Sequence, residues 1–112
     1  NVGIGDYAHI GGAGGVLIGK DTIVGSYFSV HPENHNIADI DTVIRLQGVN
    51  RQGIVIGENC WIGAKVTLLD GAVVGSGCVI AAGSVVRGSF PDNVIIGGVP
   101  AKIIKQRVSE HG

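Results

Sequence analysis

Two of the four histidines lie in the least repetitive stretch of the chain, residues 31–53, which reads HPENHNIADIDTVIRLQGVNRQG. His31 precedes Pro32, and His35 stands between two asparagines. Because a neutral imidazole takes up a proton near neutral pH, either side chain could act as the general base that activates a hydroxyl nucleophile. A histidine in a polar loop is also commonly just a solvated side chain, and composition alone does not separate the two interpretations.

Such a loop needs a rigid support, and the rest of the chain predicts one. Apolar residues recur at intervals of six: Ile56, Ile62, Leu68, Val74, Ile80 and Val86. Small or compact residues follow them four positions later: Cys60, Val66, Ala72, Cys78 and Ser84. A period of six fits neither the 3.6 of an α-helix nor the simple alternation of a strand, and it is typical of a parallel β-helix. We therefore predict an all-β fold in which both sets point inward and residues 18 apart stack at about 4.8 Å.

The spacing also predicts where the chain leaves this coil. Two further series with a period of six precede the main one: Ile4, Ile10 and Val16, then Ile18, Val24 and Val30. The distance from Val30 to Ile56 is two residues more than a multiple of six. We therefore predict that residues 31–53 form an extruded loop. Long loops on rigid scaffolds more often carry function than arise by accident.

Composition limits the class of protein. The chain has 112 residues and a net charge of −1, which predicts a single domain with a thin core and no general attraction to nucleic acid or acidic lipid. No apolar run approaches the roughly 20 residues of a membrane span. Cys60 and Cys78 are expected to be buried thiols, which fits a reducing cytoplasm. The chain lacks methionine and opens inside the repeat, so we expect a region upstream of residue 1.

Several motifs occur in a fixed order along the chain. A run of I-G-x-x hexads leads to N-H-N, D-x-D and I-R-L-Q-G-V, then to I-V-I-G-E-N-C-W-I-G-A, I-A-A-G-S-V-V and I-I-G-G-V-P-A-K-I-I-K. Over nearly its whole length the chain resembles the left-handed β-helix acyltransferases. It is similar in particular to the bacterial sugar O-acetyltransferases, including maltose, galactoside, lipopolysaccharide and capsule acetyltransferases. The hexads are shared by many enzymes, whereas the loop histidine, W-I-G-A and G-G-V-P-A-K together are more specific.

The resemblance implies a left-handed parallel β-helix over residues 1–112, acetyl-CoA as acyl donor, a loop histidine as general base and no required metal. The histidine of the family follows the opening of the last hexad before the loop by about eleven residues, and counting from Val24 gives His35. His31 lies four positions short and is the second candidate. Asp39 or Asp41 could orient the imidazole, and the sequence does not choose between them.

Five residues of the coil are candidates for binding the cofactor. Small side chains at Gly63, Ala64 and Ala82 would let a pantetheine arm approach closely. By resemblance, Ala64, Ala82 and Arg87 match positions that the family places against the cofactor. Trp61 closes its hexad and points outward, so we expect this tryptophan at a subunit boundary beside the active site.

Basic residues gather again near the C-terminus, at Lys102, Lys105 and Arg107. Pro100 and the glycine pair before it end the coil. The spacing of Lys102 and Lys105 predicts a short C-terminal helix with both side chains on one face. The resemblance assigns this face to the phosphates of the cofactor, and a solvated charged tail is the alternative.

The acceptor and the assembly follow from the resemblance. A hydroxyl of a sugar or glycan precursor is the first choice, with serine, an antibiotic hydroxyl or a sugar amine as alternatives. The loop offers four candidate acceptor contacts: Asn34, Arg45, Gln47 and Arg51. Relatives are trimers with active sites between subunits, which implies a homotrimer in which His35 faces the cofactor groove of its neighbour.

Two rival classes share the coil. The γ-class carbonic anhydrases bind zinc through three histidines, but the spacing of His9, His31 and His35 does not match their pattern. A β-helix can also be a non-catalytic scaffold, as in ice-binding proteins. Such scaffolds present regular outer faces, often with threonine arrays, whereas this chain has a long loop and no threonine ladder.

Overall fold

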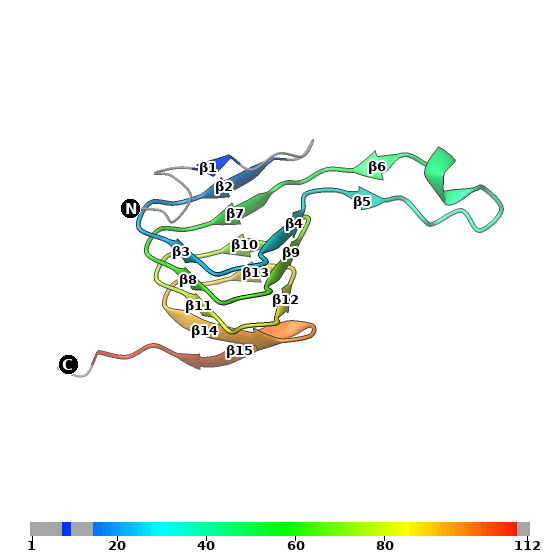
Figure 1. Ribbon diagram of the computed structural model, residues 1–112. Helices are drawn as coiled ribbons and strands as arrows, with labels where there is room; N and C mark the ends of the chain where they lie inside the picture. Colours follow the sequence, from blue (N-terminus) through cyan, green and yellow to red (C-terminus); the bar gives the residue numbers. More distant parts are fainter. Residues whose placement is uncertain (1–7, 10–14, 110–112) are drawn as a thin grey trace.

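The computed structural model describes residues 8–9 and 15–109, which form a parallel β-helix with one long arm (Figure 1). Its strands are β1 (Ala8–His9), β2 (Val16–Ile18), β3 (Ile23–Val24), β4 (Ser29–His31), β5 (Asn34–His35), β6 (Val49–Asn50), β7 (Ile54–Ile56), β8 (Trp61–Ile62), β9 (Thr67–Leu69), β10 (Val73–Val74), β11 (Val79–Ile80), β12 (Val85–Val86), β13 (Ser89–Phe90), β14 (Val94–Gly98) and β15 (Ala101–Gln106). The helical element in these ranges is the short 3-10 turn η1 (Ile44–Leu46). None of the described helices has the length and apolarity needed to cross a membrane.

Three sheets make the three sides of the coil. The first face is β1-β2-β7-β10-β13, the second face is β3-β8-β11-β14-β15, and the third face is β4-β9-β12. Val73 pairs in parallel with Val55, its partner 18 positions earlier, as the period of six predicts. Ile23 pairs with Trp61 across a larger separation because the arm lies between them. The arm therefore interrupts the chain without breaking the stacking of the coil.

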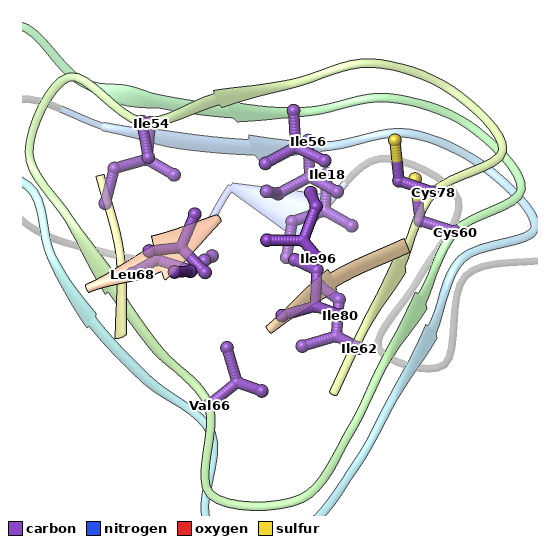
Figure 2. Close-up of a cluster of buried hydrophobic side chains, with 14 of the residues drawn as sticks. Ile18, Ile54, Ile56, Cys60, Ile62, Val66, Leu68, Cys78, Ile80 and Ile96 are labelled. Atoms are coloured by element: carbon purple, nitrogen blue, oxygen red, sulfur yellow. The ribbon is translucent and has the colours of Figure 1, made fainter. Parts of the chain in front are cut away.

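The interior confirms the positions predicted to point inward. The residues that open the six hexads are at most 1% exposed, and the compact residues four positions later are at most 2% exposed. Figure 2 shows these side chains converging inside the triangular coil. Val16 and Ile18 are also buried, whereas Ile4 and Ile10 lie outside the described residues. Burying an aliphatic side chain of this size stabilises a fold by about 1.5–3 kcal/mol, so this column is the main source of stability.

One corner of the coil is closed by a ladder of side-chain donors. The donors and their acceptor carbonyls on the next coil are Thr22 Oγ1 to Gly57 at 3.0 Å, Cys60 Sγ to Gly75 at 3.2 Å and Cys78 Sγ to Pro91 at 3.2 Å. Both cysteines are free and buried, which confirms the sequence prediction. Burial raises the pKa of the Cys60 thiol, so this group keeps the proton that it donates.

The predicted C-terminal helix is wrong, because residues 101–106 form the strand β15. The chain reverses after β14 and pairs with it in an antiparallel ladder, in which Gly98 faces Ala101 and Ile95 faces Lys105. The last strand of the second face would otherwise expose unpaired N–H and C=O groups, and β15 covers that edge. Pairing with this edge outweighs a helical preference in so short a segment.

The arm is built differently from the coil. After β4 the chain leaves as β5, passes through η1 and returns as β6, and Figure 1 shows this ribbon projecting from the body of the coil. Its two strands pair antiparallel, with Asn34 opposite Asn50 and His35 opposite Val49. The principal extents of the molecule are 58 × 28 × 21 Å, so the arm makes it markedly elongated.

Candidate functional site

His35 lies on the arm, in β5, with its side chain exposed. The antiparallel ladder with β6 sets the direction of its backbone through the pairing with Val49. Within residues 8–9 and 15–109, no group donates to or accepts from the imidazole in a hydrogen bond. The imidazole is therefore open to a hydroxyl group that approaches from outside this chain.

Gln47 organises the outer part of the arm. Its Oε1 accepts the N–H of Asp39 at 3.1 Å, and its Nε2 donates to the carbonyls of Asp39 and Thr42 at 2.7 Å each. The Asn36 amide in turn donates to the Gln47 carbonyl at 3.1 Å. The side-chain amide that the sequence proposes as an acceptor contact is thus already used inside the arm, where it holds the two legs together.

Asp39 closes the turn beyond β5. Its carboxylate accepts the Thr42 hydroxyl at 2.5 Å and the Asp41 N–H at 2.9 Å. These two hydrogen bonds, first the one from Thr42, hold the pKa of Asp39 below its usual range. The carboxylate that could have oriented the imidazole is therefore engaged in the turn.

An ion pair joins the two legs of the arm close to the coil. The Arg51 Nε lies 3.0 Å from Glu33 Oε2, and the two side chains are 51% and 37% exposed. Glu33 directly precedes β5 and lies two residues before His35. Among the four proposed acceptor contacts, Arg51 is thus paired, whereas Asn34 and Arg45 are exposed.

The third face carries the second loop histidine. His31 pairs with Leu69 in the ladder between β4 and β9. In the next ladder Leu68 pairs with Val86. Leu69 and Arg87 directly follow these two residues, so they lie side by side on adjacent coils. The outward side chains of His31, Leu69 and Arg87 therefore form one column on the outside of the coil. Arg87 and Leu69 line a hollow of about 250 Å³ together with Val85, Val99 and Pro100. The structure thus places His31 at the end of β4, on the same outer column as Arg87 and at the base of the arm.

The second face carries the tryptophan. The ladders place Trp61 in one outer column with Ile23, Val79 and Ile95. Trp61 is 59% exposed and Ile23 is 60% exposed, so the column presents an apolar strip to the outside. Contiguous exposed apolar surface of this kind marks a binding or contact surface.

The two lysines join this face through an irregularity of the last ladder. Lys102 stands opposite Gly97 and Lys105 stands opposite Ile95, because the register shifts between Ile95 and Ile96. Residues three apart on a regular strand would point to opposite faces. The bulge at Ile104 returns both lysines to the outer face, so the predicted shared face holds although the predicted helix does not.

Arg107 is fixed to the coil. Its Nη1 donates to the Gly77 carbonyl at 2.5 Å, and its backbone N–H donates to the Asn93 carbonyl at 2.8 Å. The segment that carries the three basic residues is therefore docked up to Arg107. This is the opposite of a solvated tail.

The small residues of the second face and its corner have two different explanations. A Cβ atom at Gly63 would lie 2.7 Å from the backbone nitrogen of Ala82, so stacking of the coils alone requires this glycine. Ala64 and Ala82 are exposed at the adjoining corner. Within the described ranges, their backbone N–H groups have no hydrogen-bond acceptor.

The structure brings the predicted residues together in three groups. The second face carries Trp61, Gly63, Lys102 and Lys105, with Ala64 and Ala82 at its corner. The third face carries Arg87 and His31. The arm carries His35 and the acceptor candidates. Within one chain, His35 is therefore not brought next to the second face.

The sequence analysis did not identify Asp70 or Glu33. Asp70 follows Gln52 by 18 positions, and this spacing predicts contact between adjacent coils.

A cluster of ligands typical of a metal site is not evident in the described part of the chain. No three side chains of His, Cys, Asp or Glu in those ranges are grouped so that they could hold an ion. Of the three histidines in the zinc alternative, His31 and His35 stand on the coil and on the arm respectively.

Comparisons with known proteins agree with the repeat. Residues 53–88 match the bacterial transferase hexapeptide model (six repeats). The chain is 39% identical over 113 residues to WbbJ of Escherichia coli K12, which is named for lipopolysaccharide biosynthesis as an O-acetyl transferase. The match covers 95% of this chain and 58% of WbbJ, so the chain spans little more than half of this relative.

Two solved structures are similar in fold. A maltose O-acetyltransferase from Clostridium difficile 630 superposes with a TM-score of 0.76 at 29% identity, over 84% of this chain and 49% of that protein. A hexapeptide-repeat acetyltransferase from Vibrio cholerae in complex with acetyl-CoA gives a TM-score of 0.74 at 27% identity, over 84% and 50%. The hexads, the β-helix and these likenesses together show that the chain belongs to the bacterial hexapeptide-repeat transferase family.

Proposed function

We propose that this single β-helix domain transfers an acetyl group from acetyl-CoA to a hydroxyl of a sugar or glycan precursor, with His35 as general base. The observation that carries the proposal is that the candidate base and the candidate donor-binding face lie on two different parts of the chain. An exposed imidazole stands on the arm, and a face with Trp61, Lys102 and Lys105 stands on the coil. The names of WbbJ and of the maltose enzyme support a saccharide acceptor, and the acetyl-CoA complex supports the donor.

The reaction needs one proton acceptor and a place for negative charge. The neutral His35 imidazole takes the proton of the acceptor hydroxyl while its oxygen attacks the thioester carbonyl. The carbonyl oxygen then carries a negative charge, for which the N–H groups of Ala64 and Ala82, which have no acceptor among the described residues, are candidate donors. Collapse of this tetrahedral species breaks the C–S bond and forms the ester. The leaving thiolate takes the proton back from the imidazolium, so no covalent acyl-enzyme forms.

The second face suits the donor. A coenzyme A molecule carries its negative charge on phosphates at one end and a thin pantetheine arm at the other. Lys102 and Lys105 supply two cations on the outer face, and Trp61 lies on the same face with an exposed indole. Arg87 lies apart from them on the third face, beside the apolar hollow. We assign the phosphates of the donor to Lys102 and Lys105. We assign Arg87 of an adjoining subunit to a second contact with the same donor molecule.

The shared site requires a second copy, and we infer a homotrimer. The arm exposes five large apolar side chains: Ile37, Ile40, Val43, Ile44 and Leu46, each at least 53% exposed. A two-stranded ribbon is only marginally stable alone in water. Covering these side chains with the coil of a neighbour would both stabilise the arm and bring His35 to a donor-binding face.

The test is a thiol-release assay with acetyl-CoA and a panel of sugar and glycan acceptors, made on the wild type, His35→Ala and His31→Ala. Loss of a general base lowers the rate by about 10²-fold or more, so His35→Ala should lose activity on that scale. His31→Ala is the matched control, because it removes the other candidate imidazole, which lies on the coil. The activity of this variant should change only a few-fold. The reverse ranking would move the base to His31. No turnover with any acyl-CoA would contradict the proposed function.

A further inference from the structure

The junction between arm and coil is held by one buried carboxylate. Asp70 is 8% exposed and follows β9. Its Oδ1 accepts the N–H of Gly53 at 2.7 Å, and both of its oxygens lie 3.0 Å from the N–H of Gln52. Gln52 and Gly53 are the last residues of the returning leg before β7, so the arm ends on this carboxylate.

Asp70 also stands next to the departing leg. The preceding residue, Leu69, pairs with His31 in the ladder between β9 and β4. The following residue, Gly71, donates its N–H to the Gly53 carbonyl at 2.8 Å. A side chain at Gly71 would meet the Gln52 side chain, since an added Cβ would lie 2.7 Å from Gln52 Oε1. The Asp70–Gly71 pair therefore holds the returning leg, directly after the residue of β9 that pairs with His31 at the start of the departing leg.

The ion pair that joins the two legs close to the coil is a weaker constraint. The ion pair of Arg51 with Glu33 is about half exposed, and such surface pairs contribute little because water and salt screen them. Asp70 is buried, and its hydrogen bonds are charge-assisted. The direction in which the arm leaves the coil is therefore set at Asp70 rather than at the ion pair.

We infer that Asp70 is a positioning residue that fixes the angle of the arm and thereby the place of His35; this inference rests on the proposed function. The arm beyond the junction is held internally by Gln47, so it pivots as a unit. The four residues from His31 to His35 span about 13 Å when extended. A pivot of about 5° at the junction would thus move the imidazole by about 1 Å, a misplacement that can lower a rate about 10²-fold.

The experiment compares Asp70→Ala and Asp70→Asn with the wild type. Asp70→Ala removes all acceptors from the junction, whereas Asp70→Asn keeps one oxygen that can still accept from both N–H groups. We expect kcat to fall by about 10- to 100-fold in Asp70→Ala, with the KM for acetyl-CoA changed less than twofold because the donor-binding face is untouched. Asp70→Asn should recover most of the loss.

The matched control is the same pair of substitutions at Asp92. Its carboxylate accepts the N–H of Ser76 at 2.9 Å, at a corner of the coil that carries no arm. Asp92→Ala and Asp92→Asn should leave kcat unchanged. Equal losses at both sites would mean that Asp70 only stabilises the coil, and would overturn the inference.

Hydrogen exchange provides a readout that does not depend on activity. In Asp70→Ala, the junction amides of Gln52, Gly53 and Gly71 should exchange more than tenfold faster, while those of β8, β9 and β11 keep the wild-type rates. Unchanged exchange at these junction amides would overturn the role of Asp70 even if the protein proves inactive in every assay. Faster exchange in an inactive protein would instead support the junction and count against the proposed function alone.

Discussion

The coil and the arm of this protein are stabilised in opposite ways. In the coil, inward aliphatic side chains are buried to at least 98%, and each strand pairs with its equivalent on the next coil. In the arm, the large apolar side chains are exposed, and polar side chains such as Gln47 and Asp39 hold the backbone. The coil is stable by its own packing, whereas the arm needs a neighbour and a fixed base to hold a precise shape.

This difference separates stability from chemistry. The coil can lose an outward side chain and still fold, because the interior column carries most of the burial. The arm can be displaced without unfolding the coil, because its contacts with the coil are confined to its base. Substitutions in the two regions should therefore change different measurements.

The largest effect on stability is expected from Leu68→Ala. Leu68 is fully buried in the column, and truncating such a side chain costs about 2–5 kcal/mol of the free energy of unfolding. Chemical denaturation followed by circular dichroism measures this loss. Leu69→Ala is the control, since Leu69 is the next residue of β9 but points outward and is only partly buried. Equal losses for the two variants would contradict the inward and outward pattern.

An intermediate effect is expected from charges at the tip of the arm. Ile40 is 93% exposed and Ile44 is 53% exposed, so Ile40→Asp with Ile44→Asp should leave the unfolding of the coil unchanged. If a second copy covers these side chains, burying two carboxylates against it is unfavourable, and association should weaken at least about tenfold. Analytical ultracentrifugation measures the mass, with Arg45→Gln as a control on the same tip. A wild-type protein that sediments as a monomer would contradict the shared site.

The smallest effect concerns the turn at Asp39. Because hydrogen bonds from Thr42 and Asp41 lower the pKa of Asp39 in the folded arm, their contribution is present above the usual range of aspartate. It is lost as the pH falls through the lowered pKa, so the arm should stay ordered between pH 5 and 8 and loosen only below about pH 4. Amide exchange of residues 39–47 measured against pH tests this. In Asp39→Asn the acid-induced change should be absent, and an identical acid response in this variant would assign it to another group.

The sequence predicted the coil because its repeat is redundant. Each inward position has the same local requirement, an aliphatic side chain every six residues with a compact one four residues later. This pattern is repeated many times along the chain. The buried thiols of Cys60 and Cys78 follow from the same count. The place where the chain leaves the coil was predictable too, since the distance from Val30 to Ile56 is two residues more than a multiple of six.

The arrangement of the candidate site was less predictable. Lys102 and Lys105 were expected to share a face of a helix, and they share a face of a strand because a bulge at Ile104 shifts the ladder. Gly63 was expected to make room for a cofactor, but the backbone of Ala82 already requires a glycine there. Asp70 has no motif around it, and its role depends on a junction that only the folded chain forms.

The amino-acid sequence by itself determined the period, the inward column, the point where the arm leaves the coil and the two histidines near that point. Only the tertiary structure decided that the chain ends in an edge strand, that Gln47 is used inside the arm, and that Asp70 receives the returning leg. The physical reason is that a repeat specifies side-chain burial from local spacing. Edge pairing and the hydrogen bonds at the base of the arm depend on groups that meet once, after the coil has formed.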